Sequence, residues 1–551
     1  MYHNKNSIMN KILAAVKDNP YIVLLTVFVL WMCIGIFPLE CYETDGQEII
    51  LGCDAMYREG WSLPPLYSYE YRMQPLTTIL VVALKHLLPF FSCEQIYCFM
   101  TAVTSLVFLF GCIAFAQHIT KLSKTWILIA AMLLPEMYAI AMYANTAIPA
   151  AACFVWALVL LSRERYVLTG LLLCVAVLFR LDVVIVYPAV LPLFIYEGKS
   201  FGRAFLMSAL YGLTVIVVCL FGFWLMNAEA LNTFGAYEEW NGLIQASERI
   251  VSIVGFYAPA YFLLLPVGVG VMVARKEWKA LFVVLLPIVL VHVIFASFGN
   301  ASKHFLYNAP FVIIAGVWAL KWLVEMLRPR PVLKWTAIVG VILYLTVSVR
   351  KGNLTMPWIY DNPLSKVGVV VPLYETARGE TGYSAGIGAG FQLVTGDEMM
   401  LLTGHLFYPW YIHKIKQITG DWHRQQKAVL DEAPSSDILA LEYGAYAPVA
   451  YGYLTEGYHF RQKEKMPPTY RYTLSNGQRE LNFWRIVWKQ AITDKQEVVN
   501  YIDSVAVNFS GGDAYLLPAA NHYGSSYFMD GLTPEGILEK KADKIYKIVR
   551  K

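Results

Sequence analysis

Long apolar runs dominate the first 350 residues of the chain, and short loops that carry most of the charge separate them. A run of about 17 to 25 predominantly apolar residues can cross a bilayer as a helix. We interpret eleven runs as membrane spans: Tyr21–Phe37, Tyr97–Gln117, Thr125–Met142, Thr146–Leu161, Val167–Phe179, Val183–Tyr196, Phe205–Met226, Val251–Val273, Ala280–Ser297, Pro310–Met326 and Trp335–Val349. No small-residue cleavage site follows the first run, so it is expected to be an uncleaved signal anchor.

The pattern changes near Arg350, after which polar and apolar residues mix as they do in soluble proteins. We therefore expect two parts, a helical membrane domain at 1–349 and a soluble domain at 350–551. The membrane domain would be all-α, with about eleven transmembrane helices. Its first outer loop, 38–96, would hold additional helices that lie along the membrane.

The soluble domain shows short runs that are typical of strands at 366–374 and 435–444. Residues 495–509 predict a helix that runs into a strand, so the domain is expected to be α/β or α+β. The glycine-rich turn at 386–390 lacks the preceding strand and following helix of a phosphate-binding loop. The sequence also contains no Walker A motif, dinucleotide-binding motif or nucleophile elbow.

Positive charge in the short loops predicts the orientation of the membrane domain, because cytoplasmic loops are enriched in lysine and arginine. The pattern is consistent if the N-terminus is cytoplasmic and the run Pro75–Phe91 does not cross. The basic loops then carry Lys121, Lys124, Arg163, Arg165, Lys199, Arg203, Arg275, Lys276, Lys279, Arg328, Arg330 and Lys334. We expect Pro75–Phe91, which contains Lys85 and His86, to lie in the outer interface. The protein would thus be integral to the plasma (inner) membrane, with its C-terminal domain extracytoplasmic.

Two of the expected spans, Val167–Phe179 and Val183–Tyr196, are short and are separated by only a few residues. They form either a hairpin or one long broken helix. A hairpin preserves the charge pattern of the loops, and we favour it for that reason. Arg180 and Asp182 would then lie at its outer tip.

Composition supports a membrane protein and excludes some functions. Hydrophobic residues make up 57% of the chain and charged residues 15%, whereas soluble domains are about one quarter charged. The net charge of +4 is small for this length and gives no indication of nucleic-acid binding. All nine cysteines precede residue 220, so no disulfide stabilises the soluble domain. Cys41, Cys53 and Cys93 could meet on the outer side, and we expect them to be free thiols.

The first outer loop differs from its apolar surroundings because it is acidic and aromatic. Its candidate carboxylates are Glu40, Glu43, Asp45, Glu48, Asp54, Glu59 and Glu70. A carboxylate that is partly desolvated beside a bilayer has a raised pKa, which suits a general base. Gln47–Glu59 is predicted to be a short helix, and Asp45 would precede its positive end. The simpler interpretation is that Asp45 only caps this helix.

The sequence TDGQEIILGCDAMYREGW, followed by a proline pair and then QPL, resembles the first outer loop of the GT-C superfamily of polytopic membrane glycosyltransferases. The similarity is to enzymes of the protein mannosyltransferase or aminoarabinose transferase type. The matching residues are Asp45, Ala55, Met56, Gly60, Trp61, Pro64, Pro65, Pro75 and Leu76. The resemblance implies a GT-C-like fold with Asp45 as the catalytic base. The chain departs from the common Asp-Glu pair at Gly46, and Glu48 is the candidate replacement.

Two later segments resemble the superfamily more weakly. LFRLDVVIVYPAVLPLFIY resembles a segment with a basic residue at the outer membrane edge, which implies that Arg180 contacts a lipid phosphate. A guanidinium suits a phosphate because it can donate paired, charge-assisted hydrogen bonds. NASKHFLYNAPFVII resembles a late loop that implies Lys303 and His304 as further cationic contacts. Alternatively, Arg180 pairs with Asp182 or reaches toward the interface, and His304 has no role.

Glu136 lies inside an apolar run, where a buried charge costs several kcal/mol unless it is paired, protonated or near a polar cavity. Many GT-C enzymes carry an acid at the outer end of the third span, where this chain has Asn145 and Thr146. Glu136 is therefore a second candidate for contact with the substrate.

The resemblance implies transfer of a hexosyl or pentosyl group, with inversion, from a polyprenyl-phosphate-linked donor. The acceptor would be a lipid-linked glycan, a polysaccharide or a protein. Glu48 and Asp54 are further candidates for substrate binding. Carboxylate oxygens also suit Mg²⁺ or Mn²⁺, for which Asp45 and Glu48 are the candidate ligands.

Other classes of function remain open at this point. A transporter or lipid flippase often shows internal repeats and helices interrupted within the membrane, and no repeat is visible in the sequence. A polysaccharide polymerase or ligase would carry a basic outer loop late in the chain, whereas the loop Asn227–Ile250 is acidic. A non-catalytic component of polysaccharide assembly would instead function through its C-terminal domain.

Overall fold

The structure is a computed structural model of the chain. It describes residues 19–41, 44–59, 75–134, 136–142, 144–225, 256–257, 260–298, 302–346, 349–350, 391–394, 399–402, 408–433, 436–440, 446–466, 469–486, 495–517, 532–533, 535–542 and 544–549. The expected strand at 366–374 and the glycine-rich turn at 386–390 lie outside these residues. So does the acidic loop Asn227–Ile250.

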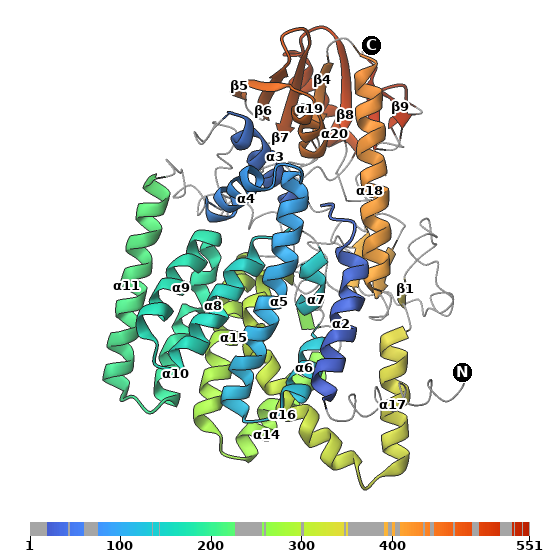
Figure 1. Cartoon of the computed structure of the whole chain (residues 1–551). Coiled ribbons are helices and arrows are strands. Elements are labelled where there is room, and N and C mark those ends of the chain that lie inside the picture. Colours follow the sequence, from blue (N-terminus) through green and yellow to red (C-terminus); the bar gives the residue numbers. More distant parts are fainter. Residues whose placement is uncertain are drawn as a thin grey trace, which may run out of the picture.

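A bundle of helices forms the larger part of the molecule, and a sheet domain covers one end of it (Figure 1). The bundle contains α2 (Pro20–Ile36), α5 (Cys93–Thr120), α6 (Lys124–Met132), α7 (Glu136–Ala139), η2 (Ile140–Met142), α8 (Ala147–Leu161), α9 (Tyr166–Phe179), η3 (Leu181–Ala189), α10 (Val190–Tyr196), α11 (Phe201–Leu225), α14 (Ala260–Ala274), α15 (Trp278–Phe298), η4 (Ser302–Asn308), α16 (Ala309–Leu327) and α17 (Pro331–Thr346). We call the end of the bundle that faces the sheet the sheet-domain end.

Three helices of the described chain are long and apolar enough to cross a membrane by themselves. They span Cys93–Thr120, Phe201–Phe221 and Phe305–Leu327. The apolar helices of 10 to 17 residues are Pro20–Ile36, Leu76–Leu87, Ala147–Leu161, Tyr166–Phe179, Leu181–Tyr196, Ala260–Ala274, Trp278–Ile294 and Pro331–Ile342. The helical character of the expected spans is thus confirmed, whereas their number is not fixed by length and composition.

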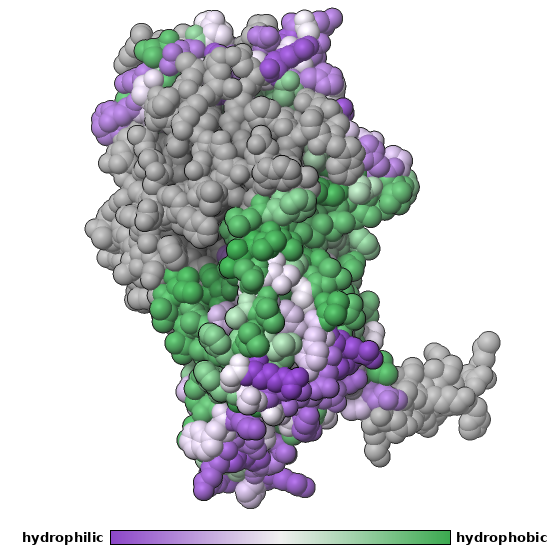
Figure 2. All heavy atoms as spheres, turned by 90° about the vertical axis from the view of Figure 1, so that its left-hand side faces the viewer, coloured by the Kyte–Doolittle hydropathy of each residue, from purple (hydrophilic) through white to green (hydrophobic). Residues whose placement is uncertain are grey.

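The surface of the bundle is that of a membrane protein. Figure 2 shows a hydrophobic band across the middle of the molecule and hydrophilic residues toward its two ends. Much of α11 is exposed and apolar, including Phe205, Leu213 and Val217, which are 60%, 61% and 58% exposed. Soluble proteins rarely expose a continuous apolar helix face, whereas lipid covers such a face without cost.

The expected span Thr125–Met142 is wrong as a single helix. The chain bends by 88° between α6 and α7, so the run forms a broken element. The sequence supplies a reason, because Pro135 lies at the break and a proline inside a helix removes a hydrogen bond and clashes with the preceding turn. Glu136 consequently begins α7 and does not lie in the middle of a helix.

The expected hairpin around Arg180 is confirmed. Arg180 has extended backbone angles (φ −163°, ψ 123°) between α9 and η3, so the helix ends there. The hydroxyl of Tyr187 donates to the carbonyl of Leu173, and these residues are equally far from Arg180 along the chain. The two legs are therefore antiparallel, although the second leg begins as a 3₁₀-helix.

Two further helices, α3 (Thr44–Glu59) and α4 (Pro75–Leu87), lie at the sheet-domain end, between the bundle and the sheet (Figure 1). Helix α4 corresponds to the run Pro75–Phe91, which was expected to lie beside the membrane. It ends at Leu87, and the chain turns through Phe90 into α5 at Cys93. Lys85 stabilises this turn by donating from Nζ to the carbonyls of Pro89 and Phe91, each at 2.7 Å.

The C-terminal domain contains a mixed sheet of seven strands in the order β5-β6-β7-β4-β8-β10-β9. Strand β4 is parallel to β7 and β8, and the other pairs are antiparallel. The domain contains α18 (Tyr408–Asp431), β4 (Ser436–Ala440), α19 (Ala447–Thr455), β5 (His459–Met466), β6 (Thr469–Ser475), β7 (Glu480–Ile486), α20 (Lys495–Ala506), β8 (Asp513–Leu517), β9 (Leu538–Ala542) and β10 (Ile545–Ile548). A small sheet precedes it, with β1 (Val349–Arg350), β2 (Phe391–Val394) and β3 (Met399–Leu402) in the order β1-β3-β2.

The predicted α/β or α+β character of this domain is confirmed, and the predicted strand at 435–444 is β4. The predicted helix at 495–509 is α20, but the strand expected at its end is wrong. The chain turns after Ala506, with Gly511 at φ +97°, and the strand begins only at Asp513. Val507 is 82% exposed, so the apolar residues there do not indicate a buried strand.

The sheet domain and the sheet-domain end of the bundle share one hydrophobic core. Ile50 and Met56 of α3 pack in the same cluster as Val449 of α19 and Leu474 of β6. The opposite face of the sheet has a separate core, which α20 covers through residues such as Ile502. Helix α3 is thus held between the membrane bundle and the C-terminal domain.

Candidate functional site

Helix α3 begins at Thr44, three residues before the expected start, so Asp45 lies in its first turn. The backbone of Asp45 is described, and its side chain lies outside the described atoms. A Cβ atom at Gly46 would lie 2.7 Å from the carbonyl oxygen of Ala144 and 2.7 Å from Sγ of Cys41. Position 46 therefore has no space for a second acid, which explains the departure from the Asp-Glu pair.

The chain just before α3 is tied to two helices. The backbone N–H of Cys41 donates to Oε1 of Glu94 in α5 at 2.8 Å. The carbonyl of Cys41 accepts a hydrogen bond of 2.9 Å from Nε2 of Gln47 in α3. The backbone of Cys41, four residues before Asp45, is consequently held by both α5 and α3.

Glu48 lies on the same face of α3 as Asp45, because residues three apart in a helix are neighbours. Its side chain is 1% exposed. Asp54 is nine residues from Asp45, which is two and a half helical turns and places it on the opposite face. It accepts a hydrogen bond from Nε of Arg58 at 2.6 Å, and burial raises its pKa above the usual value. The structure therefore does not bring Asp54 together with Asp45.

Arg180 is held by a partly buried polar network at the tip of its hairpin. Its Nε lies 2.8 Å from both carboxylate oxygens of Asp182, and its Nη1 donates to Oγ1 of Thr146 at 3.3 Å. The hydroxyl of Tyr307 in η4 donates to Oδ1 of Asp182 at 2.6 Å. The Arg180–Asp182 pair is thus observed, and contact of Arg180 with a lipid phosphate stays a prediction. Sequence reasoning missed Tyr307, because its contact with Asp182 joins residues 125 positions apart and no local pattern reports such a pairing.

A short segment between η2 and α8, from Ala144 to Thr146, connects these parts. Ala144 contacts the first turn of α3, and Thr146 contacts Arg180. Asn145 lies between them, with its N–H donating to Oγ1 of Thr101 at 3.2 Å and its Oδ1 accepting from the N–H of Ala147 at 2.6 Å. The first turn of α3, which contains Asp45, and Arg180 therefore both lie beside the segment Ala144–Thr146, although Asp45 and Arg180 are 135 positions apart in the sequence.

The remaining candidates lie close to this segment. Helix α7, which Glu136 begins, contacts both η2 and η4, and Glu136 is fully buried. Lys303 and His304 belong to η4, whose Tyr307 contacts Asp182. The side chains of Lys303 and His304 lie outside the described atoms.

The described residues contain no group of three or more His, Cys, Asp and Glu side chains arranged to hold a metal ion. The side chain of Asp45 is not among these described atoms. Asp45 and Glu48 share a helix face and would supply oxygen ligands, whereas Asp54 lies away from them. The donor set is therefore compatible with Mg²⁺ or Mn²⁺ at Asp45 and Glu48 alone.

No family model matches the sequence, and no curated protein matches it. Among solved structures, ArnT from Cupriavidus metallidurans bound to undecaprenyl phosphate is similar, with a TM-score of 0.55 and 13% identity over 96% of this chain and 98% of that chain. The same protein in the apo state gives a TM-score of 0.55 and 13% identity over 97% of this chain and 98% of that chain. The similarity extends over both the bundle and the sheet domain, so the chain shares the fold of this ArnT structure, and the expected helical membrane domain with a mixed C-terminal domain is confirmed.

Proposed function

We propose that this chain is a membrane glycosyltransferase that takes a sugar from a polyprenyl-phosphate-linked donor. The observation that carries the proposal is the meeting of three elements around Ala144–Thr146: the first turn of α3, the Arg180 hairpin and, through Tyr307, η4. The shared fold supports it, because the similar ArnT structure holds undecaprenyl phosphate. The acceptor would be a lipid-linked glycan, a polysaccharide or a protein at the outer face of the membrane.

In the proposed reaction, a hydroxyl oxygen of the acceptor attacks the anomeric carbon of the donor sugar. The bond between that carbon and the phosphate oxygen breaks, and polyprenyl phosphate leaves with the electron pair. Asp45 takes the proton of the attacking hydroxyl as general base. Attack from the side opposite the leaving group inverts the configuration of the sugar.

Arg180, Lys303 and His304 would stabilise the charge that develops on the leaving phosphate. Asp182 and Thr146 orient the Arg180 guanidinium before a substrate arrives, which reduces the cost of reorganisation. Glu48 and Glu136 remain proposed contacts of the donor sugar. A divalent ion held by Asp45 and Glu48 would add positive charge near the phosphate.

The test compares Asp45→Asn with the unchanged full-length chain in lipid nanodiscs. A panel of polyprenyl-phosphate sugars serves as donors, and mass spectrometry detects the transferred sugar. We expect Asp45→Asn to lose about a hundredfold or more of the transfer rate, which is the range for a general base. Glu456→Gln, an exposed carboxylate of the sheet domain, is the control and should keep full activity. Full activity of Asp45→Asn would remove the assignment of the base.

A transporter is the second candidate, because the 88° bend between α6 and α7 interrupts a span. It predicts that the protein moves a lipid-linked sugar between the leaflets of a vesicle without consuming it. It also predicts that no sugar is transferred to any acceptor. The two functions are therefore separated by measuring product formation and lipid movement in the same vesicles.

A further inference from the structure

Helix α18 extends from the sheet domain down to the first membrane helix, α2 (Figure 1). The two helices pack closely at Gly35, where a Cβ atom would lie 2.9 Å from Cα of Pro409. Further along, a Cβ at Gly420 would lie 3.1 Å from Oε2 of Glu40. The first half of α18 therefore lies along the chain from the end of α2 toward α3.

Two side chains of α18 bind three consecutive backbone carbonyls at the end of α2. Nζ of Lys416 donates to the carbonyls of Ile36 at 2.8 Å and Pro38 at 3.1 Å. Nδ1 of His413 lies 2.7 Å from the carbonyl oxygen of Phe37. The last carbonyls of a helix lack partners within the helix, and a cation there also interacts favourably with the helix dipole.

Lys416 is 1% exposed, which is unusual for a lysine. Burial lowers its pKa from 10.5 to about 8, while Cys98, Cys41, Glu94 and Glu40 oppose that shift. A buried ammonium is costly unless hydrogen bonds compensate it, and the backbone carbonyls of Ile36 and Pro38 supply two. The buried ammonium of Lys416 thus lies beside the chain segment that leads from α2 into α3.

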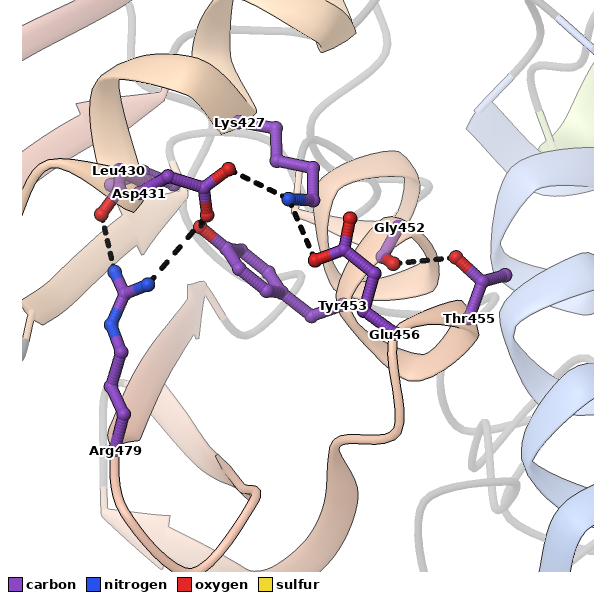
Figure 3. Close-up of polar contacts among 8 residues, drawn as sticks. All are labelled: Lys427, Leu430, Asp431, Gly452, Tyr453, Thr455, Glu456 and Arg479. Atoms are coloured by element: carbon purple, nitrogen blue, oxygen red, sulfur yellow. Dashed lines mark hydrogen bonds and ion pairs between the residues drawn. The ribbon is translucent and has the colours of Figure 1, made fainter.

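The other end of α18 is fixed inside the sheet domain (Figure 3). Lys427 lies 2.7 Å from Asp431 and 2.9 Å from Glu456. The hydroxyl of Tyr453 donates to Asp431 at 2.8 Å, and Arg479 donates to the carbonyl of Leu430. These contacts join α18 to α19 and to the β6–β7 hairpin. Since α19 packs on α3, the sheet domain contacts the chain both before and after Asp45.

We propose that Lys416 is a positioning residue for the active site, through which the C-terminal domain fixes Asp45. Lys416 holds Ile36 and Pro38, Glu94 holds Cys41, and Gly46 is pressed against Ala144. These contacts leave the segment that leads into α3 with little freedom. The proposal rests on the proposed function, in which Asp45 is the general base.

The experiment uses the full-length chain in nanodiscs and compares Lys416→Met with Lys427→Met. Methionine keeps the length and apolar stem of lysine while removing the charge and the donors. Lys427 lies on the same helix, and its ion pairs with Asp431 and Glu456 lie within the sheet domain, so it is the matched control. The two readouts are hydrogen exchange of the amides from Phe37 to Cys41, and kcat and KM for the polyprenyl-phosphate donor.

We expect faster exchange of these amides in Lys416→Met than in Lys427→Met. A displaced base should lower kcat by about tenfold to a hundredfold, with KM for the donor unchanged, because groups other than Lys416 bind the lipid. Unchanged exchange in Lys416→Met would overturn the proposal, as would faster exchange with full kcat. If the unchanged chain transfers no sugar, the proposed function fails, and the exchange result still shows whether Lys416 holds this segment.

Discussion

Gly46 lies against Ala144 so closely that a Cβ atom at position 46 would stand 2.7 Å from the carbonyl oxygen of Ala144. This contact joins the first turn of α3 to the segment that also contacts Arg180. Real Cβ atoms essentially never approach a backbone oxygen so closely, and a backbone atom cannot move aside as a flexible side chain can. The position of Asp45 relative to Arg180 therefore depends on the absence of a side chain at its neighbour.

Gly46→Ala should destabilise the protein by about 1 to 3 kcal/mol, which is the usual cost of overpacking. It should also lower the transfer rate, because the first turn of α3 must shift. The matched control is Gly212→Ala in α11, where no atom lies within 4 Å of the added Cβ. Thermal unfolding and activity of both variants check this. A Gly46→Ala variant as stable as Gly212→Ala would show that the contact is not tight.

The sequence predicted well those features that depend on local pattern. The helices of the bundle follow from long apolar runs, and the Arg180 hairpin follows from two short runs with charge between them. The break between α6 and α7 was missed because a single proline, Pro135, was outweighed by the apolar residues around it. The contact of Lys416 with Ile36 spans 380 residues, and no local pattern reports such a pairing. The reason for Gly46 likewise appears only when Ala144 is placed beside it.

Arg180→Lys should weaken binding of undecaprenyl phosphate by about tenfold, or about 1.4 kcal/mol. A guanidinium donates to Asp182 and Thr146 from different nitrogens, whereas an ammonium is a single point and cannot keep that geometry. Lipid binding is measured by native mass spectrometry or by titration in nanodiscs. Arg275→Lys is the control, since Arg275 follows α14 at the opposite end of the bundle and stacks over Trp318 at 5.0 Å. Equal affinity in the two variants would exclude Arg180 from the phosphate site.

Asp54 predicts a specific pH dependence of stability. Burial raises its folded-state pKa, so the folded protein binds a proton more tightly than the unfolded chain does. The stabilisation from Asp54 is therefore complete below its unfolded pKa and is lost as pH rises through the folded pKa. The unfolding temperature of the unchanged chain and of Asp54→Asn is measured from about pH 3 to 7. With rising pH, the unfolding temperature of the unchanged chain should fall relative to that of Asp54→Asn.

The neutral asparagine cannot titrate, so Asp54→Asn should lose this part of the fall in stability with rising pH. Other carboxylates titrate in both proteins and cancel in the comparison. Asp513→Asn is a suitable control, because Asp513 pairs with Lys547 on the surface of the sheet domain and is 41% exposed. If the unfolding temperatures of the unchanged chain and of Asp54→Asn changed with pH in parallel, the raised pKa of Asp54 would be contradicted.

The last prediction concerns the apolar face of α11. Leu213 lies at the middle of this helix and is 61% exposed, while Val507 in the sheet domain is 82% exposed. A lysine at the centre of a membrane helix costs about 2.5 to 3.5 kcal/mol on insertion scales. A lysine on a water-exposed surface costs almost nothing. Leu213→Lys should therefore reduce the amount of inserted protein in membrane fractions, and Val507→Lys should not. Equal insertion of the two variants would mean that α11 does not face lipid, since only the surrounding solvent distinguishes these two exposed apolar positions.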